Sequence, residues 1–261
     1  MDLMKGKRGL IFGVANDRSY AWSIARLLIE YGAECLFTCL PDPSGKMEHR
    51  CRLALNELGL TNPWLMPCDA ANDDDLDTVF TRIKARFDKL DFIVHSIAFA
   101  DRQFLKIGSF HTTPRNVWNQ AMDISAYSLL AMAQRGVNVM PDGGAILAMS
   151  YYGGEKVVPG YNVMGVAKAA LEHTARYLAY ELGQRNIRVN TISGGPMKTL
   201  AASAVSGISD MFEHQQRKSP LQRNITGEEV GKTAVFLLSD LASGVTGENI
   251  HVDAGFSIVG L

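Results

Sequence analysis

The sequence predicts a single α/β domain in which one parallel, doubly wound sheet carries helices on both faces. Short apolar runs alternate with longer helical patterns along all 261 residues. The apolar runs are nearly continuous, which is typical of strands covered on both faces. No Pro/Gly/Ser-rich linker, internal repeat or low-complexity tract divides the chain, and single α/β domains reach this length. We therefore expect one domain over residues 1–261, with a sheet of about seven strands.

Strands and helices are expected to alternate along the chain. Gly32 is a natural stop for the first helix, and the run DFIVH at 91–95 has the apolar character of a central strand. The predicted strands are Arg8–Phe12, Cys35–Thr38, Trp64–Pro67, Asp91–His95, Ala145–Met149, Ile187–Ile192 and Ile250–Val252. The predicted helices are Ala21–Gly32, Lys46–Leu58, Asp73–Phe87, Asn116–Val139, Pro159–Gln184 and Gly227–Ser239. Right-handed crossovers between parallel strands generate a doubly wound sheet. Such a sheet binds its ligands beyond the carboxyl ends of the strands, near the point where the winding reverses.

Charge and hydropathy restrict the class of partner. Basic and acidic residues nearly cancel, 26 against 27, so no net field draws the protein to nucleic acid or anionic lipid. The longest apolar runs fall short of the roughly 18 residues that a bilayer span needs. The N-terminus runs directly into a strand and shows no signal-peptide pattern. We expect a cytoplasmic protein that binds neither nucleic acid nor membrane.

The four cysteines predict neither a metal site nor a redox site. Cys35 and Cys39 have C-x3-C spacing, which differs from the redox C-x-x-C, and no second pair follows at zinc-finger spacing. Both fall in a predicted strand, so buried free thiols are their expected state.

The turn after the first strand suits a dinucleotide, although the G-x-G-x-x-G fingerprint is absent. Gly13 allows a tight turn and a close approach of backbone to a pyrophosphate. The next helix would point its free N–H groups at the phosphate charge. The Ser19 hydroxyl can either cap this helix or touch a phosphate. Taken alone the turn is a weak signal, because a strand–turn–helix with a serine cap also explains it.

Other strand ends supply further candidates. Asp69, after the third strand, could accept a hydrogen bond from an adenine amino group or could simply close a turn. The small residues from Ser96 onward would let backbone approach the ribose and nicotinamide. His95 itself is expected to be a packed histidine rather than a catalytic one.

The segment after the second strand favours NADH over NADPH. It usually faces the adenosine ribose, and residues 39–42 contain no Arg or Lys to pair with a 2′-phosphate. Lys46 and Arg50 follow closely enough to reach that phosphate, so the sequence indicates a preference only.

The segment after the fifth strand carries the most informative pattern, Tyr161 followed seven residues later by Lys168. Seven residues of α-helix turn through about 700°, so both side chains would share one face, about 10 Å apart along the axis. The phenol could then reach a reacting carbonyl while the ammonium reaches the cofactor ribose. A nearby ammonium would also lower the pKa of the phenol. A half-buried tyrosine and a surface lysine are the alternative, which the position in a dinucleotide fold disfavours.

Gly13, Ser19, Asp69, Ser96 and the Tyr161–Lys168 pair together resemble the short-chain dehydrogenase/reductase superfamily, whose fold is Rossmann-like. The resemblance is closer to bacterial enoyl-acyl-carrier-protein reductases of the triclosan-sensitive type. It is carried by HSIAFA (95–100), SYYGGEKVVPGYNVMGVAK (150–168), GGPMKTLAAS (194–203) and GENIHVDAGFSI (247–258). It extends from Lys5 to Ile258 without large gaps.

Position 148 distinguishes this family from others in the superfamily. Ketoreductases and alcohol dehydrogenases typically carry a serine thirteen residues before the tyrosine, and here that residue is Ala148. Tyr151 stands ten residues before Tyr161 instead, as in the enoyl reductases. Two alternatives stay open: a short-chain dehydrogenase acting on a carbonyl or alcohol, and a non-catalytic nicotinamide sensor. Ala148 disfavours the first, and the presence of both Tyr161 and Lys168 disfavours the second.

The resemblance implies that NADH reduces the double bond of a trans-2-enoyl thioester on acyl carrier protein. Tyr161 would donate a hydrogen bond to the enolate oxygen, Lys168 would hold the nicotinamide ribose, and Tyr151 would line the thioester site. Implied cofactor contacts are Gly13, Ser19, Tyr20, Leu40, Asp69, Ala70, Ser96, Ile97, Lys168, Met197, Thr199 and Ala201. Implied substrate contacts are Ala100, Tyr151, Tyr161 and Met164. Leu40 departs from the polar residue that is common at its position in the family.

Residues 195–218 are expected to form a substrate-covering lid, because the small side chains there give little to pack rigidly. A pair of short surface helices is the alternative. Lys198, Arg217, Lys218 and Arg223 could meet an acidic carrier protein, or could be ordinary surface charge. The apolar stretch from Ile225 to Leu261 predicts a subunit interface, and the resemblance implies a homotetramer.

Overall fold

The computed structural model describes residues 2–197 and 208–260, with side chains in the second range described from residue 212. Within these residues one sheet of seven parallel strands has the order β3-β2-β1-β4-β5-β6-β7. The winding reverses between β1 and β4, which confirms the predicted doubly wound sheet. The strands are β1 (Arg8–Phe12), β2 (Glu34–Cys39), β3 (Leu65–Pro67), β4 (Phe92–His95), β5 (Gly144–Ser150), β6 (Ile187–Gly194) and β7 (Asn249–Val252).

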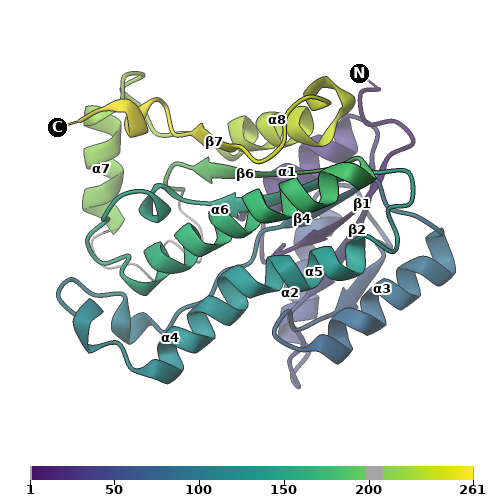
Figure 1. Cartoon of the computed structure of the whole chain (residues 1–261), viewed down its shortest axis with the longest axis horizontal. Helices are drawn as coiled ribbons and strands as arrows, with labels where there is room; N and C mark the ends of the chain where they lie inside the picture. The colour runs from purple at the N-terminus through teal and green to yellow at the C-terminus, as the bar shows by residue number, and fades with distance from the viewer. Residues whose placement is uncertain (1, 198–207, 261) are drawn as a thin grey trace.

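Helices cover both faces of the sheet, as Figure 1 shows. They are α1 (Tyr20–Glu30), α2 (Lys46–Asn56), α3 (Asp73–Phe87), α4 (Arg115–Met122), α5 (Ser128–Gly136), α6 (Val163–Leu182), α7 (Ile208–Lys218) and α8 (Gly227–Leu238). One apolar core lies between the sheet and α1, α2 and α8. A second core lies between the other face and α3, α5 and α6. The two cores account for the nearly continuous apolar runs of the strands.

The helix that the sequence predicts over Asn116–Val139 is present from Arg115 to Gly136, but its regular α-helical course and its end at Val139 are wrong. Residues Asp123–Tyr127 form a π turn between α4 and α5. The Ser128 hydroxyl donates to the carbonyl oxygen of Ile124 at 2.7 Å, and Ser125 bonds the backbone of Phe99. Side-chain bonds of this kind compete with the helical ladder, and π turns often occur at functional sites.

The predicted start of the following helix at Pro159 is also wrong. Helix α6 begins at Val163, and Tyr161 lies in the turn before it. Asn162, the cap residue, has a φ of 46°, a left-handed value that interrupts a right-handed helix. Its amide donates to the carbonyl oxygens of Phe104 and Lys106, at 2.7 and 2.8 Å, and these bonds tie the turn to the segment before α4.

The carboxyl ends of the strands define one side of the molecule. In Figure 1 the arrowhead of β6 points to the side where α4 and α7 lie, away from the N-terminus. Among the described residues no helix is long and apolar enough to cross a membrane.

Candidate active site

Beyond the end of β1 the backbone makes an unusually close approach to the end of β4. Gly13 has a φ of 98°, and a β-carbon added to it would lie 2.1 Å from the carbonyl oxygen of Ser96. Only glycine fits such a contact, because the conformation and the space both exclude a side chain. The result is a bare backbone turn at the switch point of the sheet, where a doubly wound fold binds its ligand.

The N-terminus of α1 opens onto this turn. Ser19 is its cap residue: the hydroxyl accepts a hydrogen bond from the Trp22 N–H at 3.2 Å and donates to the Asn16 carbonyl at 2.8 Å. The structure thus shows the capping role that the sequence left open for Ser19. N–H groups in the first turn of a helix lack intrahelical acceptors and carry partial positive charge. The turn and the helix together fit a pyrophosphate, although contact between Ser19 and a phosphate stays a prediction.

Tyr20, the first residue of α1, reaches across to the end of β6. Its hydroxyl donates to the carbonyl oxygen of Gly195, and a β-carbon on Gly194 would lie 3.0 Å from its ring. Burial, together with the neighbouring Tyr151, raises the pKa of the Tyr20 phenol. This phenol therefore stays protonated and ties the start of α1 to the backbone just beyond β6.

The residues predicted to face adenosine lie beyond β2, β3 and β4. The Asp69 carboxylate accepts a hydrogen bond from the Ala71 N–H at 3.0 Å, so it closes a turn as one interpretation predicted. Ala70 is buried, Ile97 is half-buried and Leu40 is 52% exposed. Their contacts with a cofactor remain predictions.

Lys168 is not the surface lysine of the alternative interpretation. It is only 5% exposed, and its ammonium donates to the carbonyl oxygen of Met149, at the end of β5, at 2.6 Å. Burial lowers the pKa of Lys168 to about 8, and the charge of Glu172 opposes that decrease. The ammonium is therefore charged at neutral pH and loses its proton as the pH rises through about 8.

Tyr161 and Tyr151 lie against each other. Their ring centroids are 4.8 Å apart, with the planes at 68°. A β-carbon on Gly153 would lie 2.4 Å from the Tyr161 ring, so the ring occupies space that a side chain at position 153 would need. The structure thereby brings together the two tyrosines that the sequence singled out.

The predicted decrease in the pKa of Tyr161 is wrong. Burial raises the pKa of the phenol above its ordinary value, and the neighbouring Tyr151, Tyr20 and Glu172 raise it further. Burial also raises the pKa of Tyr151 to about 12. Both phenols are therefore protonated at neutral pH and available as hydrogen-bond donors.

The predicted substrate contacts fall into one apolar cluster. Its buried members are Leu105, Ala121, Val163 and Met164, with Ala100, Trp118 and Tyr161 packed against them. The cluster combines all the predicted substrate residues except Tyr151, which adjoins it through the Tyr161 ring. An apolar wall beside a phenol suits an acyl group with one polar end.

Sequence reasoning missed two side chains that shape this site. The Ser125 hydroxyl accepts a hydrogen bond from the Phe99 N–H at 2.9 Å and fixes the segment that carries Ala100. Glu172, one helical turn beyond Lys168, is 4% exposed and accepts a hydrogen bond from the Ser150 hydroxyl. The i, i+4 spacing of Lys168 and Glu172 was visible in the sequence, but it normally indicates a surface ion pair.

The segment expected to be a lid is described only in part. Thr199, Ala201 and Lys198 lie outside the described residues, while Met197 is half-buried. The C-terminal part of the segment is the helix α7. That the segment covers a substrate stays a prediction.

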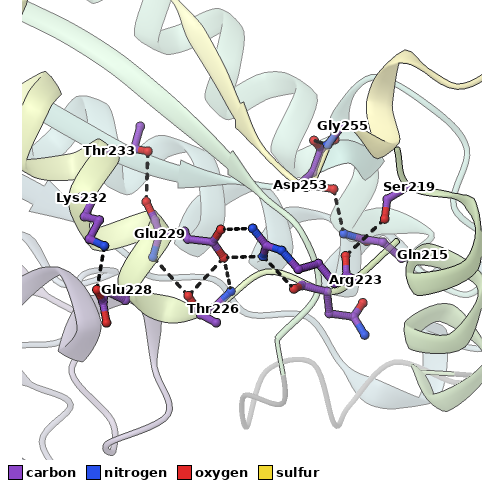
Figure 2. A network of polar contacts seen from close by, with 11 residues as sticks. Gln215, Ser219, Arg223, Thr226, Glu228, Glu229, Lys232, Thr233, Asp253 and Gly255 are labelled. Carbon is purple, nitrogen blue, oxygen red and sulfur yellow. Dashed lines mark hydrogen bonds and ion pairs between the residues drawn. The ribbon is translucent and has the colours of Figure 1, made fainter. Parts of the chain in front are cut away.

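Figure 2 shows how the end of α7 is fixed to its surroundings. The buried Gln215 amide donates to the carbonyl oxygen of Asp253 at 3.2 Å, and Ser219 donates to that of Arg223. Arg223 binds both carboxylate oxygens of Glu229, at 2.6 and 3.0 Å, and Glu229 completes a capping box with Thr226. Arg223 therefore belongs to a structural network at the surface, and its contact with a carrier protein stays a prediction.

The other residues discussed from the sequence, His95, the four cysteines and Ala148, lie in the interior of the fold or close to it. His95 is fully buried with its Nε2 2.7 Å from the Ser128 hydroxyl, so the packed interpretation is confirmed. All four cysteines are free; three are buried and Cys35 is half-buried. Ala148 is buried in the core, where it lies beside His95 across the β4–β5 pair.

The sheet is doubly wound, with a bare glycine turn at its switch point and a tyrosine and a buried lysine beyond β5. These features define a reductase of the short-chain dehydrogenase type. The sequence model described as enoyl-(acyl carrier protein) reductase matches residues 13–257. The chain belongs to the enoyl-acyl-carrier-protein reductase family.

Individual relatives agree with this assignment. The enoyl-acyl-carrier-protein reductase (NADH) FabI of Synechocystis is 47% identical over 258 residues, which are 99% of each chain. The corresponding Bacillus cereus protein is 47% identical over 260 residues, the full length of both chains. The solved structure of the Bacillus cereus reductase with NADP+ and indole naphthyridinone has a TM-score of 0.96 and covers all of both chains. The Anaplasma phagocytophilum reductase, solved with NAD, has a TM-score of 0.93, is 44% identical, and matches 99% of this chain and 97% of its own.

Proposed function

We propose that the protein reduces the trans-2 double bond of enoyl thioesters carried by acyl carrier protein, with NADH as the reductant. The observation that supports this most strongly is the arrangement of two protonated phenols, Tyr151 and Tyr161, beside an apolar cluster, with the buried Lys168 on the helix that follows. The family's full-length relatives are NADH-dependent enoyl reductases by name.

The site fits a nicotinamide dinucleotide. The close approach of Gly13 to Ser96 leaves backbone where a side chain would block a pyrophosphate, and α1 offers its N-terminus to the phosphates. Gly13, Ser19, Tyr20 and Met197 would hold the phosphate side, and Leu40, Asp69, Ala70, Ser96 and Ile97 the adenosine and ribose side. Thr199 and Ala201 are proposed cofactor contacts from the family resemblance alone.

When bound, NADH supplies a hydride for the β-carbon of the enoyl group. As charge develops on the thioester oxygen, Tyr161 donates a hydrogen bond to it from a phenol that burial keeps protonated. One donor of this kind in a buried site contributes about 3–4 kcal/mol to transition-state stabilisation. Lys168 contributes a positive charge next to the ribose position, and Tyr151 completes the wall on the thioester side.

Ala148 supports double-bond reduction rather than carbonyl reduction. A hydroxyl at this position holds the carbonyl or alcohol in the ketoreductases, whereas the methyl group of Ala148 is buried and cannot form a hydrogen bond. A non-catalytic nicotinamide sensor would not require two paired phenols and a buried lysine.

The protein is proposed to work as a cytoplasmic homotetramer, with residues 195–218 as the substrate-covering lid. The candidate contacts with acyl carrier protein are Lys198, Arg217, Lys218 and Arg223. Three exposed tyrosines on the outer faces of the π turn and α6, Tyr127, Tyr177 and Tyr180, are suited to pack against other subunits. β7 is an edge strand of the sheet, which also favours pairing with another subunit.

Initial rates of NADH and NADPH oxidation with a trans-2-enoyl thioester, beside a β-ketoacyl thioester, test the proposal. Fast NADH turnover on the enoyl substrate alone is the expected result. Activity on the ketoacyl substrate instead would return the protein to the broader superfamily, and faster turnover with NADPH would overturn the cofactor preference.

A further inference from the structure

A buried carboxylate lies one helical turn beyond Lys168, and the mechanism above does not use it. Glu172 is only 4% exposed, although a carboxylate is costly to bury without partners. In α6 the residues i and i+4 lie on the same face, so Glu172 and Lys168 point into the same part of the interior. An acidic and a basic group buried on the same helix face need a reason in the structure or in the chemistry.

The carboxylate is held from the β5 side. The Ser150 hydroxyl, at the last residue of β5, donates to Glu172. The chain then turns back over α6, and a β-carbon on Gly154 would lie 2.7 Å from the same carboxylate oxygen. Ser150 immediately precedes Tyr151, so the bond joins the helix that carries Lys168 to the strand end that carries the thioester wall.

We propose that Glu172 is a positioning residue that acts on the reaction through Lys168. Its buried carboxylate, oriented by Ser150, keeps the neighbouring ammonium protonated at the pH at which the enzyme works. This inference rests on the proposed function, because it assigns Glu172 a role in a reaction in which the charge of Lys168 takes part.

Apart from Glu172, the described groups that face Lys168 are neutral and do not help to keep the ammonium protonated. The ammonium donates to the Met149 carbonyl oxygen, a neutral acceptor from β5. From β4 it faces His95, whose pKa burial and the charge of Lys168 lower to about 3, so that this imidazole is neutral at working pH. Among the described residues, Glu172 provides the negative charge that opposes the effect of burial on Lys168.

The surroundings of Glu172 contain charges of both signs. Burial raises the pKa of the carboxyl group, whereas the Ser150 hydrogen bond lowers it. Glu155 raises it further, while Arg176 on α6 and His251 on β7 lower it. His251 Nε2 lies 2.8 Å from Glu155, so the two outer charges partly compensate each other when the imidazole is protonated.

The Glu172→Gln variant removes the charge and keeps a group that can accept the Ser150 hydrogen bond. The difference in the free energy of unfolding between the protein with Lys168 and the Lys168→Met variant changes with pH as Lys168 titrates in the native state. Urea unfolding of the unliganded protein at pH 6 to 10 measures this difference. We expect this titration to move down by about one pH unit in the Glu172→Gln background. The alkaline limb of kcat/KM should move by the same amount, which makes activity at pH 8.5 about tenfold lower than in the wild type.

Glu181→Gln is the matched control, because it makes the same chemical change at an exposed position of the same helix. In this variant the unfolding titration and the alkaline limb of kcat/KM should both stay at their wild-type pH. Should the amide not be accommodated at position 172, Glu172→Met provides the same test with an apolar side chain of similar length.

An unfolding titration that stays at the same pH in the Glu172→Gln background overturns the inference, whatever the activity. That result would mean that the carboxyl group is protonated in the working range or too far from the ammonium to act on it. Absence of enoyl reduction by the wild type would instead overturn the proposed function, while the unfolding titration would still report on the Glu172–Lys168 pair.

Discussion

The corner between β1 and α1 presents backbone to the space beyond the sheet, whereas the corner between β5 and α6 presents buried side chains. At the first corner Gly13 lies against the Ser96 carbonyl, and α1 turns its N-terminus toward the space beyond the sheet. At the second, Lys168 and Tyr161 have pKa values that burial has moved away from their ordinary values. The first corner thus depends on the absence of side chains, and the second on the identity of functional groups. Substitutions at the two corners should therefore impair the protein for different physical reasons.

The largest effect is expected from Tyr161→Phe. The phenylalanine ring keeps the contacts with Tyr151 and Gly153 but removes the hydrogen-bond donor, so kcat should fall by about 10²–10³-fold. The NADH dissociation constant, measured by fluorescence titration, should stay within a factor of about two. Tyr31→Phe makes the same change at the C-terminal end of α1 and should be silent. A Tyr161→Phe enzyme with wild-type kcat would show that this phenol does not stabilise the enolate.

Gly13→Ala should disrupt the other corner through geometry alone. Its β-carbon would meet the Ser96 carbonyl oxygen at 2.1 Å at a positive φ, so we expect a loss of about 2–4 kcal/mol in the free energy of unfolding. NADH affinity should fall in parallel. Gly6→Ala is the control, because Gly6 also has a positive φ but nothing lies within 4 Å of its β-carbon position. It should cost about 1 kcal/mol, and equal losses at both positions would argue against a steric role for Ser96.

Lys168→Met should stabilise the folded protein in a way that depends on pH. The native pKa of Lys168 is about 8 and its ordinary value 10.5, so between these values the unfolded chain holds a proton that the native protein has released. Stability contributed by this position therefore rises with pH in the wild type, and the variant lacks that rise. The advantage of Met should be about 3 kcal/mol below pH 8, before any packing loss, and should disappear toward pH 10.5.

Urea unfolding at pH 7 and pH 9.5 measures this difference. Lys84→Met, at an exposed position of α3, should show no such pH dependence. A stability difference at position 168 that is constant across the pH range would mean that burial does not lower the pKa of Lys168 in the native protein.

The smallest effect is expected from Ser19→Ala. Loss of the α1 cap should cost about 1 kcal/mol of stability and, if Ser19 also touches a phosphate, a several-fold loss of NADH affinity. Thr226→Ala removes the cap of α8 and should cost a similar amount of stability while leaving NADH binding unchanged. If the two variants behave alike in both measurements, Ser19 is a helix cap only.

Strand positions and sheet winding could be predicted because they depend on local patterns. Helix α3 has the predicted bounds, since Asn72 caps its start and accepts bonds from two N–H groups of the first turn. The start of α6 could not be predicted in the same way. The left-handed Asn162 is stabilised by carbonyl groups more than fifty residues away along the chain, and no local pattern reports them.

The residues of the candidate site were singled out from the sequence, but the direction of the Tyr161 pKa shift was not. Tyr151, Tyr161 and Lys168 were identified from their spacing and from the family resemblance. The direction of the Tyr161 pKa was missed because it depends on burial, and a sequence position does not say how deeply a phenol is covered. Glu172 was missed because a carboxylate four residues after a lysine has the pattern of a solvated helix face.

Gly153 makes the reaction corner hard to alter by mutation. The Tyr161 ring lies 2.4 Å from where a β-carbon at position 153 would be, and every single-nucleotide change that replaces a glycine introduces such a carbon. Any substitution selected at position 153 would therefore have to displace the Tyr161 ring, which we propose that the substrate needs.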